Sequence, residues 1–366
     1  MNNSTVGTDD DDNLPTFPVY VYIVFGTVGG LITVFTVLGN LLTVLSYIRD
    51  NKLHSVYNTY ILNLAIADFI LGFVVLPIYM VYEIGPSSFF LDYYLCKAFY
   101  VIDFTVCVEG VFMMIIISYD RLMLLRCGMS YNQIETKRKC SIVIGLSWVL
   151  AFLVYGPSII FWDIWQDKDD INVPGMCDVQ FAHHSVFTTT TAFLEFFIPL
   201  ILLSVVDISI ITELRKRTKF RITSIFRKSF RRSSKSKSES TKSKSSLISI
   251  NESKVDSVKS KDSKRKDKKC QTDYRKRREK KAMKSLGLLM AVFFVTWAPY
   301  TIYTIIKSVR KGDIELLSYE ALTWFLWLKS AVNPLLYAFN SKRYRRNFKF
   351  FLCCFKSLPI FRKNEL

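Results

Sequence analysis

Seven long apolar runs constrain what this chain can fold into. Each run reaches the ~20 residues that an apolar helix needs to cross a bilayer, while charged residues make up only 22% of the chain. Because lipid offers the backbone no hydrogen-bond partners, each run is expected to be a helix. The expected spans are Val19–Tyr47, Tyr57–Tyr82, Tyr94–Leu125, Cys140–Trp162, Ser185–Ile211, Met283–Val309 and Leu316–Phe339. The sequence therefore predicts an all-α membrane protein, a seven-transmembrane helix bundle, and it excludes a soluble single-core enzyme and a secreted disulfide scaffold.

Half of the 10 prolines lie inside these spans. They are Pro77, Pro157, Pro199, Pro299 and Pro334. Each would cost about 3 kcal/mol inside a soluble helix, whereas packed membrane helices tolerate the resulting kinks.

The distribution of charge predicts the orientation of the chain. The N-terminal tail carries an acidic run, Asp9 to Asp12, and no Lys or Arg, so a cleavable signal peptide is not expected. The loops after the first, third and fifth spans are basic, and basic loops stay in the cytoplasm. We expect a multi-pass protein of the cell membrane with its N-terminus extracellular and its C-terminus cytoplasmic.

The same pattern divides the chain into five segments. Residues 1–18 form an extracellular acidic tail, 19–214 helices one to five, 215–281 the third cytoplasmic loop, 282–340 helices six and seven, and 341–366 an interfacial helix with a short tail. The region from Arg215 to Lys284 holds the basic excess of a chain whose net charge is +18. Its Ser- and Lys-rich sequence predicts disorder, with membrane-surface attraction and phosphorylation favoured over nucleic-acid binding.

Two pairs of residues are candidates for modification on the outer side. Asn2 and Asn3 lie in overlapping glycosylation sequons. Cys96 and Cys177 are the cysteines expected near the outer surface, where oxidising conditions would join them in a disulfide.

The C-terminal segment predicts a membrane-surface helix. Lys342–Phe351 alternates basic and aromatic residues, as a short amphipathic interfacial helix does. Cys353 and Cys354 follow it and are predicted palmitoylation sites, the alternative being two unmodified cytosolic thiols.

Two carboxylates within the spans are the leading candidates for ligand recognition, because ionisable groups in a bilayer are costly. Asp103 lies two helical turns (~10 Å) below Cys96 and the outer surface, with Cys107 one turn deeper on the same face. Glu195 lies four residues before Pro199, so the proline leaves the carbonyl of Glu195 without its helical partner and bends the helix there.

Aromatic residues accompany these carboxylates: Phe104, Trp297, Tyr300, Trp324 and Trp327. A carboxylate within an aromatic cage is how proteins hold a small ammonium ion. Packing explains any one of these rings by itself, but the set together with a buried aspartate favours a ligand cage.

The motifs within the spans resemble those of one receptor family. They are Asn40 after Gly39, Leu64 to Asp68, Asp120-Arg121-Leu122, Trp148, Pro199, Phe293 with Trp297 to Tyr300, and Asn333-Pro334 with Tyr337. In this order and spacing, over essentially every span, the chain is similar to rhodopsin-like (class A) G-protein-coupled receptors. Asp103 matches the amine-anchoring aspartate of the aminergic branch. Within that branch, segments 148–157, 193–199 and 297–301 resemble histamine receptors of the third and fourth subtypes.

The resemblance implies a biogenic-amine receptor, with histamine as the first candidate ligand. Asp103 would pair with the ammonium and Glu195 with the imidazole. The implied ligand-binding set is Asp103, Phe104, Cys107, Thr191, Glu195, Trp297, Tyr300, Thr301, Trp324 and Trp327. The set implied for activation and coupling is Asp120, Arg121, Glu279, Asn333, Pro334 and Tyr337, with Glu279 as the acidic partner of Arg121. The implied partners are a heterotrimeric G protein of the Gi/o class, arrestin and receptor kinases, and no cofactor or metal is implied.

Some residues depart from the family pattern. Leu122 replaces a tyrosine, and Asp207, also at a tyrosine position, is expected to compete with Glu279 for Arg121.

Lys329 is the most unusual departure. Relatives keep a small polar residue there, in a sodium pocket around Asp68 that in this chain retains Ser330 but has Gly110 in place of a serine. We hypothesise that the ammonium of Lys329 pairs with Asp68, and with Glu109, and replaces the sodium ion.

Alternatives remain at this point. The ligand could be another cationic amine, such as acetylcholine or a trace amine. A small-solute transporter is disfavoured because the two halves of the sequence show no repeat. In a retinal-binding photoreceptor the lysine would stand at Trp327, and Lys329, ~200° further around the helix, is expected to point away from the pocket. The sequence has three histidines and no nucleophile elbow or phosphate-binding loop, so an enzyme is not expected.

Overall fold

The computed structural model describes residues 18–84, 92–166, 177, 181, 184–239, 287–310 and 316–356. The predicted sites Asn2, Asn3 and Glu279, and the side chain of Cys354, lie outside the described residues. Within the described ranges the regular elements are all helices, which confirms the predicted all-α bundle.

The long helices follow the apolar runs. They are α1 (Val19–Arg49), α2 (Val56–Ile70) continued by α3 (Leu76–Ile84), α4 (Tyr93–Cys127), α6 (Lys137–Gln166), α7 (Ser185–Ala192) continued by α8 (Ile198–Glu239), an unlabelled helix Gly287–Arg310, and α10 (Leu316–Asn340). Shorter elements are the 3-10 turns η1 (Asn51–Leu53) and η3 (Gly128–Ser130), the helix α5 (Tyr131–Ile134), and the C-terminal helix α11 (Lys342–Lys356).

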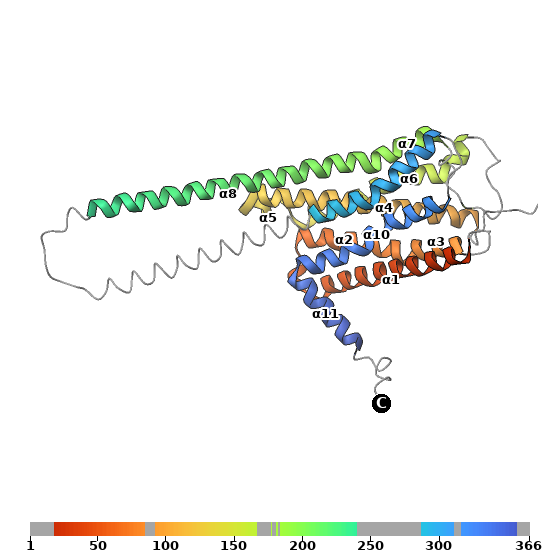
Figure 1. The fold of residues 1–366 in the computed structure, drawn as a ribbon, viewed down its shortest axis with the longest axis horizontal. Helices are drawn as coiled ribbons and strands as arrows, with labels where there is room; N and C mark the ends of the chain where they lie inside the picture. Colours follow the sequence, from red (N-terminus) through yellow and green to blue (C-terminus); the bar gives the residue numbers. More distant parts are fainter. Residues whose placement is uncertain are drawn as a thin grey trace, which may run out of the picture.

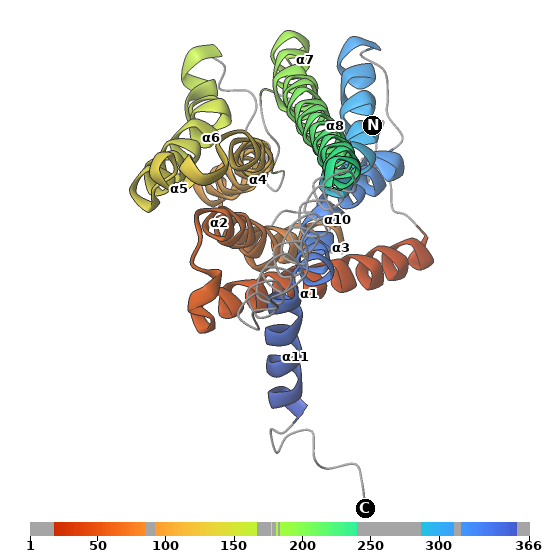
Figure 2. The same cartoon turned by 90° about the vertical axis from the view of Figure 1, so that its left-hand side faces the viewer.

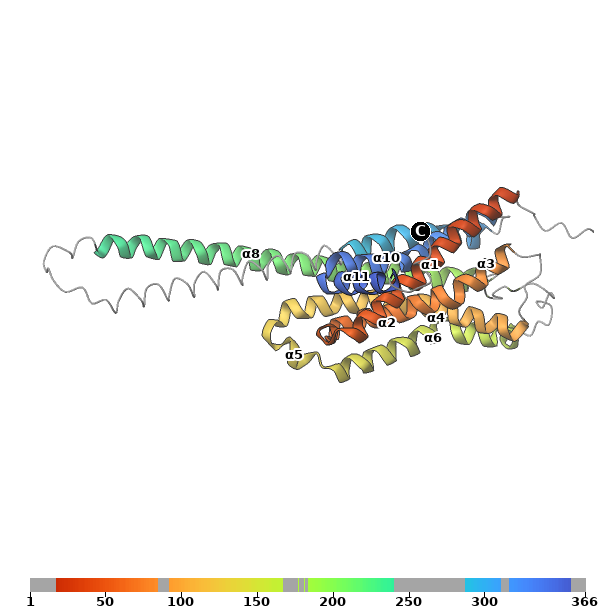
Figure 3. The ribbon, with the colours of Figure 1, turned by 90° about the horizontal axis from the view of Figure 1, so that it is seen from below.

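The long helices pack side by side along a common direction (Figures 1 and 2). α4 contacts α2, α6 and α8, while α1 contacts α2 and α10. α11 follows α10 at one end of the bundle and also contacts α1 (Figure 3). Because α4 has neighbours on several sides, its buried polar residues, such as Glu109 and Asp120, face other helices.

Six of these helices are long and apolar enough to cross a membrane. They are Val19–Arg49, Val56–Tyr82, Tyr93–Cys127, Lys137–Trp162, Ser185–Arg217 and Gly287–Arg310. The seventh expected span, Leu316–Phe339, is a helix as predicted, but α10 is not in this apolar set. Its sequence includes Lys329 and Asn333, both buried in the bundle, so part of this helix serves polar contacts with its neighbours instead of lipid.

Two prolines follow π-helical turns. The turn η2 (Leu71–Val75) precedes Pro77, and the turn η6 (Phe193–Phe197) precedes Pro199. Each proline lacks the N–H that would bond to the carbonyl four residues earlier, and in both cases that carbonyl lies in the π turn. The disturbance predicted at Glu195 therefore takes the form of a π-helical turn.

A buried asparagine replaces the hydrogen bond that Pro334 removes from α10. The carbonyl four residues before Pro334 belongs to Ser330, and the proline has no N–H to donate to it. The side-chain Nδ2 of Asn40 in α1 donates to that carbonyl at 3.1 Å and to the carbonyl of Thr36 at 2.9 Å. The helices approach closely here, since a Cβ added at Gly39 would lie 2.8 Å from Cγ of Pro334. This hydrogen bond and the close approach hold α1 against α10.

A second buried network joins α2, α4 and α6. Glu109 is fully buried, and its Oε1 accepts from Nδ2 of Asn63 at 2.6 Å and from the hydroxyl of Ser147 at 2.9 Å. The indole Nε1 of Trp148 donates to Oδ1 of Asn63 at 3.0 Å. Glu109 thus links three helices through Oε1, while its Oε2 is buried without a hydrogen-bond partner among the described residues.

The structure corrects the start of the loop expected to be disordered from 215 to 281. α8 continues as a helix to Glu239, well beyond the expected end of the span at Ile211 (Figure 1). Residues 215–239 contain no proline or glycine and are rich in Lys and Arg, which are good helix formers. An ion pair between Glu213 and Arg217, at 3.6 Å and one turn apart, supports the extension. The remainder of the loop, 240–281, lies outside the described residues.

Asn40→Leu should lower the free energy of unfolding by about 1–3 kcal/mol, because it leaves the Ser330 carbonyl buried without a partner. Thermal unfolding of the purified full chain in detergent measures this loss as a fall in Tm. In Asn40→Leu/Pro334→Ala, the alanine supplies an N–H for Ser330, so part of the stability should return. A double variant as unstable as the sum of the two single variants would show that Asn40 does not act on the carbonyl exposed by Pro334.

Candidate ligand site and candidate coupling site

Asp103 and Cys107 lie one turn apart on the same face of α4. The Cys107 thiol donates to Oδ1 of Asp103 at 3.5 Å, as the spacing predicts. Cys107 is buried and Asp103 is partly exposed. A carboxylate accepts several hydrogen bonds and a thiol is a weak donor, so Asp103 keeps the capacity to pair with a cation.

Glu195 lies in the π turn η6 and faces α6. The hydroxyl of Tyr155 interacts with the Glu195 carboxylate and with Thr191, which lies one turn earlier and is buried. Glu195 is within electrostatic range of Asp103. Two carboxylates from separate helices therefore share one region of the bundle interior.

Tyr155 is a residue of this region that the sequence analysis missed. It is buried, and its ring centroid lies 4.5 Å from that of Phe104 and 5.6 Å from that of Phe181. Phe104, which was expected in the aromatic cage, thus packs against Tyr155 of α6. A tyrosine inside a membrane span needs a partner for its hydroxyl, and that requirement is the signal that could have identified Tyr155.

Lys329 points into the interior of the bundle. Its Nζ lies 4.0 Å from the ring centroid of Trp297, and the residue is only 4% exposed. Its charge is within electrostatic range of Asp68, Asp103 and Glu195. The prediction that Lys329 points away from the ligand region is wrong, because its long side chain carries the ammonium far from its own backbone to the ring of Trp297.

The predicted ion pairs of Lys329 with Asp68 and Glu109 are also wrong. Lys329 forms no ion pair within the described part of the chain. Asp68 instead accepts from Nδ2 of Asn333 at 2.8 Å, and Glu109 belongs to the network of Asn63 and Ser147. The π face of an indole attracts a cation. The ring of Trp297 therefore stabilises the ammonium of Lys329, a role that was predicted for the carboxylates of Asp68 and Glu109.

Gly110 lies beside the ammonium of Lys329. A Cβ added at Gly110 would lie 3.6 Å from Nζ, an ordinary van der Waals contact. An alanine at this position would therefore fit beside the lysine side chain without displacing it.

Trp324 and Trp327 of α10 pack as a pair against α3. Their ring centroids are 5.5 Å apart, and they lie 6.0 and 4.8 Å from that of Tyr79. The Tyr79 hydroxyl donates to Glu320, and a Cβ added at Gly29 of α1 would lie 2.8 Å from the Trp324 ring. These tryptophans, expected to line the cage, also pack the junction of α1, α3 and α10.

The helix Gly287–Arg310 contributes three of the predicted ligand residues. Trp297 and Thr301 are buried, and the Thr301 hydroxyl donates to the carbonyl of Trp297 at 3.1 Å. The hydroxyls of Tyr300 and Tyr319 lie 3.3 Å apart. Tyr300 thus connects this helix to α10.

The structure forms the expected disulfide between Cys96 and Cys177, whose Cα atoms are 5.8 Å apart. The hydroxyl of Tyr100 donates to the carbonyl of Cys177 at 3.1 Å. Both contacts fix residue 177 against the first turns of α4, two turns before Asp103.

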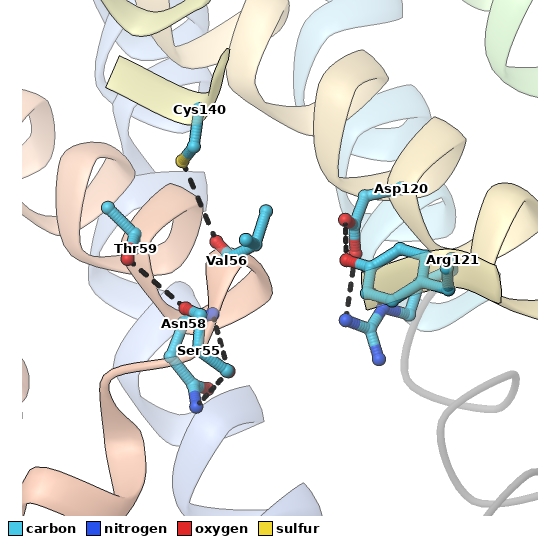
Figure 4. Close-up of polar contacts among 8 residues, drawn as sticks. Ser55, Val56, Asn58, Thr59, Asp120, Arg121 and Cys140 are labelled. Carbon is cyan, nitrogen blue, oxygen red and sulfur yellow. Dashed lines mark hydrogen bonds and ion pairs between the residues drawn. The ribbon is translucent and has the colours of Figure 1, made fainter. Parts of the chain in front are cut away.

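Near the other end of α4, Arg121 is held by its neighbour and by an aromatic ring. Its Nε and Nη2 donate to Oδ2 of Asp120 at 3.2 and 2.8 Å (Figure 4), and its guanidinium carbon lies 3.4 Å from the ring centroid of Tyr57. The Tyr131 hydroxyl donates to the other oxygen of Asp120. Burial and this hydrogen bond raise the pKa of Tyr131, so the phenol remains a donor.

The expected competition of Asp207 with Glu279 for Arg121 involves a residue, Glu279, that lies outside the described residues. Asp207 forms no ion pair with Arg121 within the described residues, and its Oδ1 is buried without a hydrogen-bond partner. Arg121 is already bound to Asp120, its neighbour in the chain. Leu122, which stands at a tyrosine position, is buried in the apolar core.

Two residues of the predicted activation set connect α10 to the rest of the bundle. Asn333 donates to Asp68 as described, and Tyr337 is buried with its ring centroid 6.1 Å from that of Tyr344 in α11. Among the described residues, no group of three or more His, Cys, Asp or Glu side chains is placed to hold a metal ion.

Comparison with known proteins shows the family. The model of the 7 transmembrane receptor (rhodopsin family) matches residues 39–337, which is most of the chain. The chain therefore belongs to the rhodopsin family of seven-transmembrane receptors. These are receptors and not enzymes, in agreement with the expectation from the sequence.

Individual relatives confirm the resemblance to the aminergic branch. The chain is 30% identical to the histamine H4 receptor of Homo sapiens over 366 residues, covering 90% of this chain and 92% of that receptor. It is 29% identical to the trace amine-associated receptor 6 of Homo sapiens over 340 residues, covering 92% and 86%. It is 28% identical to the muscarinic acetylcholine receptor M3 of Pongo pygmaeus over 218 residues, covering 60% and 37%.

Tyr131→Phe should lower the free energy of unfolding by about 1.5–3 kcal/mol, because it removes a buried hydrogen bond to the carboxylate of Asp120. Thermal unfolding of the purified chain measures the effect. Tyr119→Phe is the matched control, since Tyr119 lies one residue before Asp120 but is 50% exposed. Equal losses in the two variants would mean that the Tyr131–Asp120 contact contributes nothing particular to stability.

Proposed function

We propose that this chain is a receptor for a small cationic amine, with histamine as the first ligand to test. The observation that carries the proposal is the pair of carboxylates, Asp103 on α4 and Glu195 in η6, within electrostatic range of each other in the bundle interior. Histamine has one group for each: its ammonium pairs with Asp103, and its imidazole N–H donates to Glu195. The names of relatives, which include histamine H4 receptors of three species, support this choice.

The remaining predicted ligand residues take roles consistent with their places. Cys107 and Thr191 lie beside the two carboxylates, and Trp297 with Lys329 forms the inner boundary of the site. Phe104, Tyr300, Thr301, Trp324 and Trp327 provide the surrounding walls. Tyr155 also interacts with the Glu195 carboxylate, so it belongs to the same site.

The coupling proposal rests on the opposite end of α4. The N-terminus is extracellular, and the basic loops and C-terminus face the cytoplasm. A heterotrimeric G protein of the Gi/o class binds at the end that carries Asp120 and Arg121, where Glu279 competes with Asp120 for the guanidinium in the inactive state. Asn333, Pro334 and Tyr337 take part in the change of α10 that opens this end.

Other expectations belong to the same proposal. Arrestin and receptor kinases act on the serine-rich segment 215–281 and the C-terminal tail. Asn2 and Asn3 carry glycans, and Cys353 and Cys354 carry palmitate, which anchors α11 at the membrane surface.

Another amine is the second candidate ligand, since relatives of this chain are named for trace amines and acetylcholine. Acetylcholine has no second group for Glu195, so the dependence of binding on Glu195 separates these ligands. A transporter is distinguished by a direct assay: a receptor accelerates guanine-nucleotide exchange on a G protein without moving solute.

Binding of radiolabelled histamine should depend on both carboxylates. Asp103→Asn and Glu195→Gln should each weaken binding by about 30-fold or more, because each leaves one end of the ligand without its buried charged partner. Saturation binding to membranes that express the full chain measures this. Asp92→Asn, which neutralises an exposed carboxylate just before α4, is the control and should bind as the wild type does.

The outcomes of this experiment distinguish the ligands. Loss with Asp103→Asn alone would indicate a monoamine whose ring is held by other residues. Wild-type binding in both variants would contradict the two-carboxylate site. No binding by well-folded wild type would exclude histamine while leaving the receptor family unchanged.

We also propose that the ammonium of Lys329 is a resident cation that replaces sodium near Asp68. Agonist affinity of the wild type should then be insensitive to added Na⁺. Lys329→Ser vacates the space over Trp297, so in this variant added Na⁺ should weaken agonist binding, and Lys329→Ser/Asp68→Asn should lose that sensitivity. Na⁺-sensitive binding in the wild type would contradict the proposal.

A further inference from the structure

The ammonium of Lys329 has no hydrogen-bond acceptor within the described part of the chain. Its side chain is 4% exposed, and no hydrogen bond or ion pair of the described residues involves it. The ring of Trp297, whose centroid lies 4.0 Å from Nζ, attracts the charge, but the three N–H bonds of the ammonium still lack an oxygen or nitrogen acceptor. A buried donor without an acceptor costs free energy, so a ligand that supplies the acceptor would be favoured here.

This ammonium lies against the face of α4 that carries Asp103. A Cβ added at Gly110 would lie 3.6 Å from Nζ of Lys329. Asp103, Cys107 and Gly110 follow one another at spacings of four and three residues, so they share one face of the helix. Gly110 lies two turns, ~10 Å, beyond Asp103 along α4. The carboxylate of Asp103 and the ammonium of Lys329 therefore stand at two depths along the same face.

Glu195 completes a set of three charged groups around this region. Its carboxylate, in the π turn η6, is partly exposed, and Lys329 is within electrostatic range of both Glu195 and Asp103. The two carboxylates accept hydrogen bonds, and the ammonium can only donate them. A ligand that satisfies all three groups must therefore offer two donors and one acceptor.

We propose that Lys329 donates a hydrogen bond to an uncharged acceptor atom at the end of the amine ligand far from its ammonium. The inference rests on the proposed receptor function and adds a specificity-determining residue to it. A neutral imidazole has one N–H and one acceptor nitrogen, so the ring can donate to Glu195 and accept from Lys329 while the ligand ammonium pairs with Asp103. Two hydrogen bonds of about 3 Å each, joined by a two-carbon chain and a ring, span a distance of the order that separates Asp103 from Lys329.

The same arrangement disfavours a diamine. Two carboxylates alone would suit a ligand with an ammonium at each end. A second ammonium at the inner end would face the like charge of Lys329 in a region of low dielectric constant, and it would offer no acceptor. Lys329 therefore selects a ligand with one positive charge and a neutral polar ring.

The test compares two amines that differ only in the acceptor atom. Histamine and its analogue with a pyrrole ring both carry an ammonium and a ring N–H, but pyrrole has no acceptor nitrogen. Dissociation constants are obtained from the rise in Tm of the purified full chain as each amine is added, in potassium buffer without Na⁺. The variants are Lys329→Met, which keeps a long side chain, and Lys329→Ser. Gly110→Ala is the matched control, since its added methyl group lies beside Nζ at an ordinary contact distance.

Wild type and Gly110→Ala should bind histamine at least about tenfold more tightly than the pyrrole analogue, because only histamine accepts from a charged donor. In both Lys329 variants the two amines should bind within about threefold of each other. The ratio isolates this hydrogen bond, since both amines carry the same charge and respond alike to the loss of the lysine charge. It also separates binding from folding, because each dissociation constant refers to the folded molecules alone.

Three results would overturn the inference. A preference for histamine that is equal in wild type and in both Lys329 variants would assign the acceptor contact to another residue, while the receptor function would stand. Tighter binding of the diamine putrescine than of histamine to the wild type would contradict the predicted repulsion by Lys329. If neither histamine nor its analogue bound to folded wild type, the proposed histamine function would fail, and this inference would fail with it.

Discussion

The bilayer core contains no water to satisfy buried polar groups, and the rest of this structure depends on that constraint. The sequence removes backbone donors from its own spans by placing prolines there. In the structure, π turns precede Pro77 and Pro199. The Ser330 carbonyl, which has no helical partner because of Pro334, accepts a hydrogen bond from the side chain of Asn40. This hydrogen bond also fixes how closely α1 and α10 approach, because a short side chain must reach the backbone of the neighbouring helix.

The same constraint applies to the carboxylates inside the bundle, which differ in how exposed they are. Glu109 is fully buried and bound by Asn63 and Ser147, so it serves to hold helices together. Asp103 and Glu195 are partly exposed, as the proposed binding of an amine to them requires. The proposed ligand site is therefore distinguished from the structural network by access and not by residue type.

α4 connects the regions that matter for function. The disulfide of Cys96 fixes its first turns, Asp103 follows two turns later, and Arg121 lies about 27 Å further along the same helix. At that end Asp120 and Tyr131 hold the guanidinium, so any partner that binds Arg121 must compete with them. A single long helix thus carries both the proposed ligand anchor and the proposed coupling residue, and the neighbouring helices supply their partners.

The sequence alone determined the helical spans, the disulfide between Cys96 and Cys177, the disturbance of the helix at Glu195 and the family, because bilayer thickness, helical spacing and motif order can be read from one chain without its fold. Only the tertiary structure decided the partner of each charge. Lys329 lies on Trp297 instead of pairing with Asp68, and Arg121 binds Asp120 and not Asp207. Trp324 and Trp327 pack on Tyr79, and Tyr155 joins Glu195. Spacing along a helix tells which face a residue occupies, whereas the choice of partner depends on the distance to other helices and on the reach of each side chain.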